Sequence, residues 1–118
     1  KEEIKKYKEI IKNKYNVEIN YRNKKYKLEG FIDTGNRLIS PIKKEAIILV
    51  NLNINSKELI YVPYKALNTT GIIPCIKPER IIIDNKEIKN CLVGLAKDKF
   101  EINGLNCILP NKLKEELC

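Results

Sequence analysis

Short apolar segments recur along the chain about every ten residues, and turn-forming residues separate them. The strand candidates after the first hairpin are residues 46–52, 58–63, 72–76, 80–84, 87–93 and 106–109. Turn formers such as Thr69-Thr70-Gly71 and Asp84-Asn85 lie between them. Only the two ends of the chain, residues 2–14 and 110–117, have a helical pattern. The sequence therefore predicts an all-β fold, a small closed β-barrel with short terminal helices.

A β-hairpin is predicted near the start of this pattern. Apolar residues occupy every second position at Val17, Ile19 and Tyr21 and again at Tyr26 and Leu28. The turn-forming residues 22–24 stand between the two runs. Residues 16–118 are long enough for one domain of ordinary size, and we expect them to form one.

Residues 1–15 are expected to be a basic leader or linker helix. Residues 1–27 hold ten Lys or Arg against four Glu, which accounts for most of the net charge of +8. A solvated basic face explains this charge, and so does attraction to an anionic membrane surface beside a membrane anchor. Because the chain begins at Lys1 and has no Met, we expect a fragment of a longer protein. No apolar run reaches the roughly 20 residues that a spanning helix needs, so the fragment alone is expected to be soluble.

The residue types that are absent exclude several kinds of enzyme. The chain has no His, which excludes Ser-His-Asp and Cys-His nucleophiles and His-based zinc sites. The cysteines at 75, 91, 107 and 118 form no CxxC, so we predict buried thiols, with Cys118 at the chain end a candidate for exposure, and no metal and no cofactor. General acid or base catalysis must therefore come from other groups, and the carboxylates are the first candidates.

Nucleic acid is not an expected partner, although the chain is basic. It has no glycine-rich phosphate loop, and its aromatic residues form no visible stacking platform. A purely electrostatic nucleic-acid module is an alternative, and a steep loss of binding with salt would support it.

The segment Phe31-Ile32-Asp33-Thr34-Gly35 has the form of the aspartic peptidase motif. The apolar pair ends a core strand, and Asp33 presents its carboxylate at the loop. The Thr34 hydroxyl can lock this loop, while Gly35 allows close approach because it lacks a Cβ. Asn36 completes the predicted active-site loop.

The motif occurs once, whereas peptide hydrolysis by this route needs two carboxylates that share a proton. The second Asp33 must then come from a second chain, which predicts a homodimer with the two carboxylates on its axis. The alternative is a non-catalytic β-barrel binding module in which Asp33 belongs to an ordinary turn. Substitution of Asp33 distinguishes these readings.

Four segments together resemble the sporulation sigma-E factor processing peptidases, the SpoIIGA family. They are Phe31-Ile32-Asp33-Thr34-Gly35-Asn36-Arg37-Leu38, Val62-Pro63-Tyr64-Lys65-Ala66-Leu67, Ile76-Lys77-Pro78-Glu79-Arg80-Ile81 and Leu92-Val93-Gly94-Leu95-Ala96. Thr34 stands where that family usually has Ser, and it keeps the hydroxyl. The resemblance implies an aspartic endopeptidase of the retroviral-protease type that removes the pro-sequence of pro-sigma-E.

The same resemblance implies a location and a regulator. Family members sit in the membrane of spore-forming bacteria, with the peptidase domain on the cytoplasmic side in the mother cell, and they respond to the signal protein SpoIIR. It further implies that residues 64–76 form a flap, with Thr69, Thr70 and Gly71 near its tip. A late apolar strand, either 92–94 or 107–109, is expected to pass behind the catalytic loop.

Overall fold

Nine strands form one sheet in the computed structural model, which describes residues 14–33, 45–66, 69–96 and 106–117. The strands are β1 (Lys14–Tyr21), β2 (Lys24–Asp33), β3 (Ala46–Val50), β4 (Ile60–Ala66), β5 (Thr69–Ile76), β6 (Arg80–Ile83), β7 (Lys86–Ile88), β8 (Cys91–Leu95) and β9 (Cys107–Pro110). A 3-10 turn, η1 (Asn111–Leu113), and a short helix, α2 (Lys114–Leu117), follow. The all-β prediction is therefore confirmed, as is helical structure after β9.

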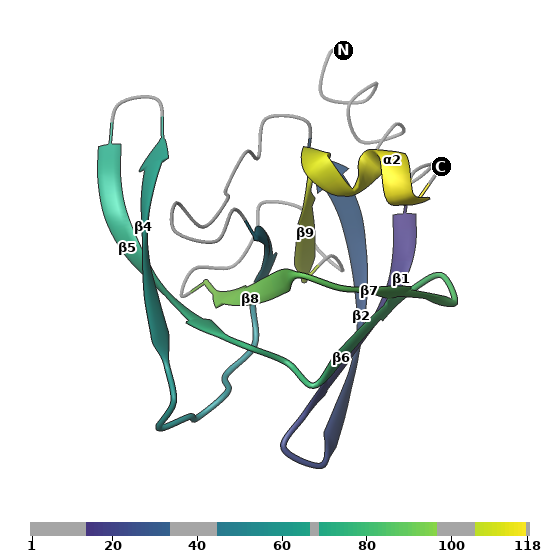
Figure 1. Ribbon diagram of the computed structural model, residues 1–118, viewed down its shortest axis with the longest axis horizontal. Helices are drawn as coiled ribbons and strands as arrows, with labels where there is room; N and C mark the ends of the chain where they lie inside the picture. Colours follow the sequence, from purple (N-terminus) through teal and green to yellow (C-terminus); the bar gives the residue numbers. More distant parts are fainter. Residues whose placement is uncertain (1–13, 34–44, 67–68, 97–105, 118) are drawn as a thin grey trace.

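The strand order is β4-β5-β8-β3-β9-β2-β1-β6-β7. β4 and β7 are the two ends of this order, and no pairing joins them among the described residues. The described strands thus make an open, strongly curved sheet (Figure 1). The predicted closure into a barrel is not found there. The centre of the sheet is mixed, because β9 runs parallel to β2 and antiparallel to β3.

The first hairpin forms where the sequence predicts it. β1 and β2 are antiparallel, and the turn between them consists of Arg22 and Asn23, both with positive φ (50° and 63°). Two consecutive residues with positive φ are typical of the type I′ turn, whose twist matches that of the flanking strands. β1 begins at Lys14, so the predicted helix 2–14 is wrong at its last residue; residues 1–13 lie outside the described part.

One predicted strand is two strands. Residues 87–93 were expected to be continuous, but β7 ends at Ile88 and β8 begins at Cys91. Asn90 lies between them with φ 58°, a left-handed conformation that Asn tolerates better than most residues. The chain changes direction there, so β7 pairs with β6 while β8 pairs with β3.

The sheet curves around a main hydrophobic core and has a second, smaller one. Ile19, Ile48, Ile83 and Leu109 belong to the main core and are fully buried. The second core consists of Ile47, Val62, Ile73, Cys75 and Leu92, so it lies between the β4–β5 hairpin and strands β3 and β8. The hairpin is thus held by its own set of contacts.

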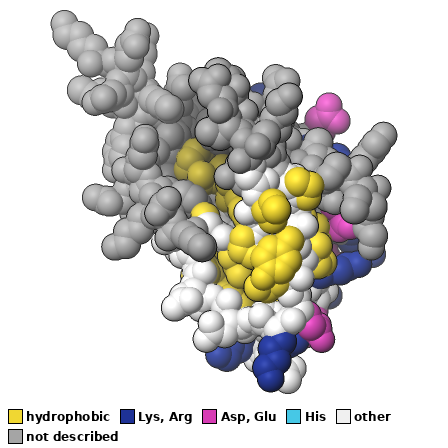
Figure 2. Space-filling view, turned by 90° about the vertical axis from the view of Figure 1, so that its left-hand side faces the viewer, with side chains coloured by type: hydrophobic (Ala, Val, Ile, Leu, Met, Phe, Trp, Pro, Cys, Tyr) yellow, Lys and Arg dark blue, Asp and Glu magenta, His cyan; other side chains and the backbone are white. Residues whose placement is uncertain are grey.

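Within the part of the chain that the structure describes, the β4–β5 hairpin pairs with the rest of the sheet only at its base. β5 pairs with β8 through Cys75 and Ile76, immediately after Pro74, while β4 is an edge strand that contains Pro63. Among the described residues, the exposed large hydrophobic side chains all belong to this hairpin; they are Ile60, Tyr61 and Ile72. Figure 2, which views this side of the molecule, shows hydrophobic side chains gathered in one patch.

Candidate active site

Asp33 is the last residue of β2, at the end of a strand in the centre of the sheet. β2 runs parallel to β9, and the register places Asp33 opposite Pro110. Of the two late strands considered for this position, residues 107–109 therefore lie beside the strand of Asp33. Residues 92–94 belong to β8, which pairs with β3 and β5 instead.

The apolar pair before Asp33 anchors this strand end, as the motif predicts. Phe31 is buried, and Ile32 is half-buried against the main core. Full burial of a side chain such as Phe31 contributes roughly 1.5–3 kcal/mol to folding, and half-buried Ile32 contributes less. The backbone of Asp33 is therefore held by its two predecessors and by β9. Thr34, Gly35 and Asn36 lie outside the described residues, so the rest of the predicted loop stays a prediction.

Gly30 allows β2 and β9 to approach closely three residues before Asp33. A Cβ at this position would lie 3.1 Å from both the Cβ and the carbonyl oxygen of Cys107, and 3.2 Å from its Sγ. Two of these three atoms cannot rotate away. The residue opposite Cys107 in this register must therefore be glycine.

A buried carboxylate that the sequence analysis missed lies at the same end of the sheet. Glu45 directly precedes β3 and is 8% exposed, the one buried charged residue in the described part of the chain. β3 is antiparallel to β9, so the start of β3 lies toward the Pro110 end of β9, with β9 between it and the strand of Asp33. The surrounding sequence, Lys43-Lys44-Glu45, gives no periodic signal that would predict burial.

The segment predicted to be a flap, residues 64–76, lies within the β4–β5 hairpin. Ala66 pairs with Thr69, so the connection consists of residues 67 and 68, which lie outside the described part. Thr69, Thr70 and Gly71 are the first three residues of β5 after this connection, and Gly71 lies opposite Tyr64. In Figure 1 the free end of the hairpin and the Asp33 end of β2 point toward the same side of the molecule.

The described cysteines are unsuited to act as nucleophiles. Cys75, Cys91 and Cys107 are buried and free. Burial raises the pKa of the Cys75 thiol to about 11 and that of Cys91 to about 12. The pKa of Cys107 is raised further, first by burial and then by Cys91. Because the thiolate is the reactive form, these side chains are inert core residues at neutral pH, as predicted for buried thiols.

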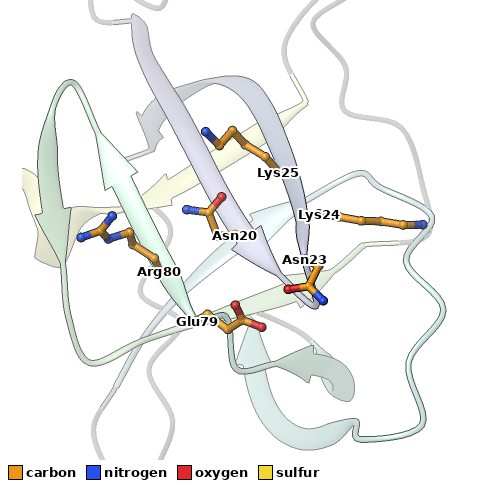
Figure 3. A pocket seen from close by; sticks show the side chains of 6 residues that line it. All are labelled: Asn20, Asn23, Lys24, Lys25, Glu79 and Arg80. Atoms are coloured by element: carbon orange, nitrogen blue, oxygen red, sulfur yellow. The ribbon is translucent and has the colours of Figure 1, made fainter.

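A shallow pocket lies at the other end of β2. It is lined by Asn20, Asn23, Lys24, Lys25, Glu79 and Arg80 (Figure 3). Lys24 and Asp33 are the first and last residues of the ten-residue β2, which separates them by about 30 Å. Glu87 pairs with Arg80 at 2.7 Å, and Glu18 lies 3.9 Å from Lys25, so acidic neighbours offset much of the positive charge. This pocket is therefore distinct from the Asp33 end of the sheet and has no concentrated charge for a ligand.

Comparison with known proteins gives two matches. The family Peptidase U4, described as sporulation factor SpoIIGA, matches residues 1–61, which include Asp33-Thr34-Gly35. The probable sporulation sigma-E factor-processing peptidase of Clostridium acetobutylicum is 28% identical to this chain. That match covers 80% of this chain and 40% of the relative, so the chain spans well under half of that protein. Within the described residues, no helix has the length and apolar character needed to cross a membrane.

Proposed function

Because the chain belongs to the sporulation factor SpoIIGA family, we propose that it is the peptidase part of an enzyme that processes the precursor of sigma-E. The relative from C. acetobutylicum carries that activity in its name. The precursor, pro-sigma-E, is the substrate in this proposal.

The proposed mechanism is that of an aspartic endopeptidase. One Asp33 carboxylate takes a proton from a water molecule while the water oxygen attacks the scissile carbonyl carbon. A second, protonated carboxyl donates its proton to the carbonyl oxygen. The tetrahedral intermediate collapses as the C–N bond breaks and the amine leaves with a proton. The Thr34 hydroxyl holds the catalytic loop in place, and Gly35, which has no Cβ, lets the substrate approach it closely. No metal or cofactor takes part.

The second carboxyl comes from a second copy of the chain. The sequence contains one Asp-Thr-Gly, and neither Asp84-Asn85-Lys86 nor Asp98-Lys99-Phe100 repeats it. Two chains related by a twofold axis bring the two Asp33 residues together. Each chain then provides half of the active site. The dimer of two such chains has the retroviral-protease type of fold in this proposal.

Three further parts of the proposal concern the surroundings of the site. The β4–β5 hairpin, with Thr69, Thr70 and Gly71 near its free end, covers bound substrate and excludes water. Residues 1–15 link the domain to a membrane anchor in the longer protein. The domain then works on the cytoplasmic, mother-cell side of the membrane, and the signal protein SpoIIR acts through the membrane part.

The observation that carries the proposal is the position of Asp33 at the end of a central strand, within the sequence Phe-Ile-Asp-Thr-Gly. The decisive experiment compares wild type with Asp33→Asn, which is nearly isosteric but cannot act as a base. With the purified sigma-E precursor as substrate, cleavage by Asp33→Asn should fall by several orders of magnitude. The circular dichroism spectrum and the unfolding midpoint should stay close to those of wild type.

Cleavage by Asp33→Asn at the wild-type rate would show that Asp33 is an ordinary turn residue and that the assignment is wrong. Pepstatin, which carries a tetrahedral hydroxyl, should inhibit the wild-type chain, whereas a metal chelator should have no effect. The opposite pattern of inhibition would also contradict the aspartic mechanism.

A further inference from the structure

Asn106 forms an unusual junction between β9 and the strand that carries Asp33. It directly precedes β9, and its side-chain Oδ1 accepts a hydrogen bond from the backbone N–H of Glu29 in β2 at 3.1 Å. Its own N–H donates to the Glu29 carbonyl oxygen at 3.3 Å. Asn106 therefore forms hydrogen bonds with both the backbone N–H and the backbone carbonyl of Glu29.

The side chain of Asn106 takes the place of a strand backbone. In a parallel pair, the N–H and the carbonyl of one residue bond to two different residues of the neighbouring strand. Here the second partner of Glu29 is the Asn106 side chain rather than an earlier carbonyl of the chain. The ladder between β2 and β9 therefore begins at Asn106, with no unsatisfied donor on Glu29.

A second asparagine fixes Asn106 itself. The backbone N–H of Asn51, just after β3, donates to the Asn106 carbonyl oxygen at 3.0 Å. The Asn51 Nδ2 donates to the carbonyl oxygen of Ala96, just after β8, at 3.2 Å. The two asparagines therefore connect the ends of β8 and β3 to the start of β9 and to β2.

Asn106 and Gly30 act on neighbouring positions of the same strand pair. Position 30 accepts only glycine opposite Cys107, because any Cβ there would meet the Cβ and the carbonyl oxygen of Cys107. Asn106 binds Glu29, one residue earlier on both strands. A shift of β9 by one residue would break the Asn106 bonds and would place Cys107 opposite Glu29 or Phe31, both of which carry a Cβ.

We propose that Asn106 is a positioning residue for Asp33, because it fixes the register of β9 against β2. This inference rests on the proposed function, in which Asp33 is catalytic. Glu29 and Asp33 are four residues apart on β2, or about 13 Å, and Asn106 and Pro110 have the same spacing. A slip of one residue would move the two strand ends past each other by about 3.3 Å. Misplacement of a reacting group by about 1 Å can lower the rate roughly 100-fold.

The test compares Asn106→Ala with Asn106→Asp in the 118-residue chain. Aspartate keeps an oxygen acceptor for the Glu29 N–H, whereas alanine removes it. Ile88→Val in β7, a strand that pairs with β6 and not with β2 or β9, is the control for a general loss of core stability. Two quantities are measured: kcat and KM for cleavage of the sigma-E precursor, and backbone amide exchange at residues 29–32 by NMR.

We expect Asn106→Ala to lower kcat at least tenfold, to change KM less than about threefold, and to speed exchange at residues 29–32 about tenfold. Asn106→Asp and Ile88→Val should stay within about threefold of wild type in kcat. If Asn106→Ala does not fold, Asn106→Ser, with a shorter side-chain oxygen, replaces it, and its kcat should be lower and its amide exchange at residues 29–32 faster than those of Asn106→Asp.

Two results would overturn the positioning role: equal kcat for Asn106→Ala and Ile88→Val, or equal losses for alanine and aspartate. Failure of the proposed function has a different signature, since Asp33→Asn would then cleave like wild type. Amide exchange remains decisive even if no cleavage occurs. Unchanged exchange at residues 29–32 in Asn106→Ala would by itself refute the proposal that Asn106 fixes the register of β9 against β2.

Discussion

Asp33 and Pro110 stand opposite each other at the ends of two parallel strands, β2 and β9. The pairing of the two strands begins with Gly30 opposite Cys107 and reaches the last residue of each strand. Pro110 has no N–H, so it donates no backbone hydrogen bond to a neighbouring strand. The backbone of Asp33 therefore lies beside a residue whose φ is fixed by its own ring.

Mixed dimers should have little activity if the site is shared between two chains. When wild-type chains are mixed with a ninefold excess of Asp33→Ala chains, most wild-type chains pair with an inactive partner. Random pairing should lower the activity per wild-type chain roughly tenfold. Cleavage is measured after the two proteins have re-equilibrated. Unchanged activity per wild-type chain would show that the site lies within one chain.

Gly30→Ala should destabilise the fold, because the new Cβ meets the carbonyl oxygen and Cβ of Cys107 at 3.1 Å. Overpacking of this kind costs about 1–3 kcal/mol in the free energy of unfolding, measured by urea denaturation. Cys107→Ala in the same chain removes only the Sγ contact, so we expect a partial rescue at most. Full rescue by Cys107→Ala would mean that the backbone is not the obstacle.

Gly94→Ala should disturb the packing of the β4–β5 hairpin against β8. A Cβ at Gly94 would lie 2.9 Å from the Cδ1 of Ile73, which belongs to the hairpin. Ile73→Val removes that Cδ1 and should relieve part of the clash. The double variant should therefore be more stable than the sum of the two single changes predicts, by about 0.5–2 kcal/mol in a double-mutant cycle. Additive effects would place the strain on Ile47 or Leu49 instead, which the same Cβ meets at 3.1 Å.

The stability of the folded chain should fall between pH 9 and pH 11 in part because of Cys75. Burial raises the pKa of this thiol from 9.0 to about 11 in the folded state. Below pH 9 the thiol is protonated in both states. Above pH 9 it ionises in the unfolded chain first, which favours unfolding until the pH passes the folded-state value. In urea titrations at pH 8 and pH 10, Cys75→Ala should lose less stability over this interval than wild type, and equal losses would contradict the assignment.

The sequence predicted the features that depend on local patterns. Alternating residues around 22–24 predicted the first hairpin, and the apolar pair before Asp33 predicted an anchored strand end. The all-β class followed from the number of short strands, and the buried cysteines followed from the absence of a CxxC. Each of these depends on residues that are close together in the chain.

Features that depend on distant pairings were beyond the sequence. The choice between residues 92–94 and 107–109 beside Asp33 is decided by the parallel pairing of β2 with β9, which lie far apart in the chain. Burial of Glu45 and the Asn106 junction depend on contacts with distant strands and have no local signal. The break at Asn90 was missed because apolar character continues on both sides of it.

Pro63 also has a consequence for aggregation. β4 is an edge strand beside exposed Tyr61 and Ile72, and an apolar edge of this kind can recruit a strand from another molecule. Pro63 pairs with Ile72, and Pro74 pairs with Tyr61, so both prolines occupy positions where the two strands do not exchange hydrogen bonds. The nitrogen of Pro63 then faces the edge of β4 that pairs with no described strand, and it offers no donor there to an incoming strand. Chains brought together at high local concentration can therefore meet without fusing their sheets through β4 into a growing fibril.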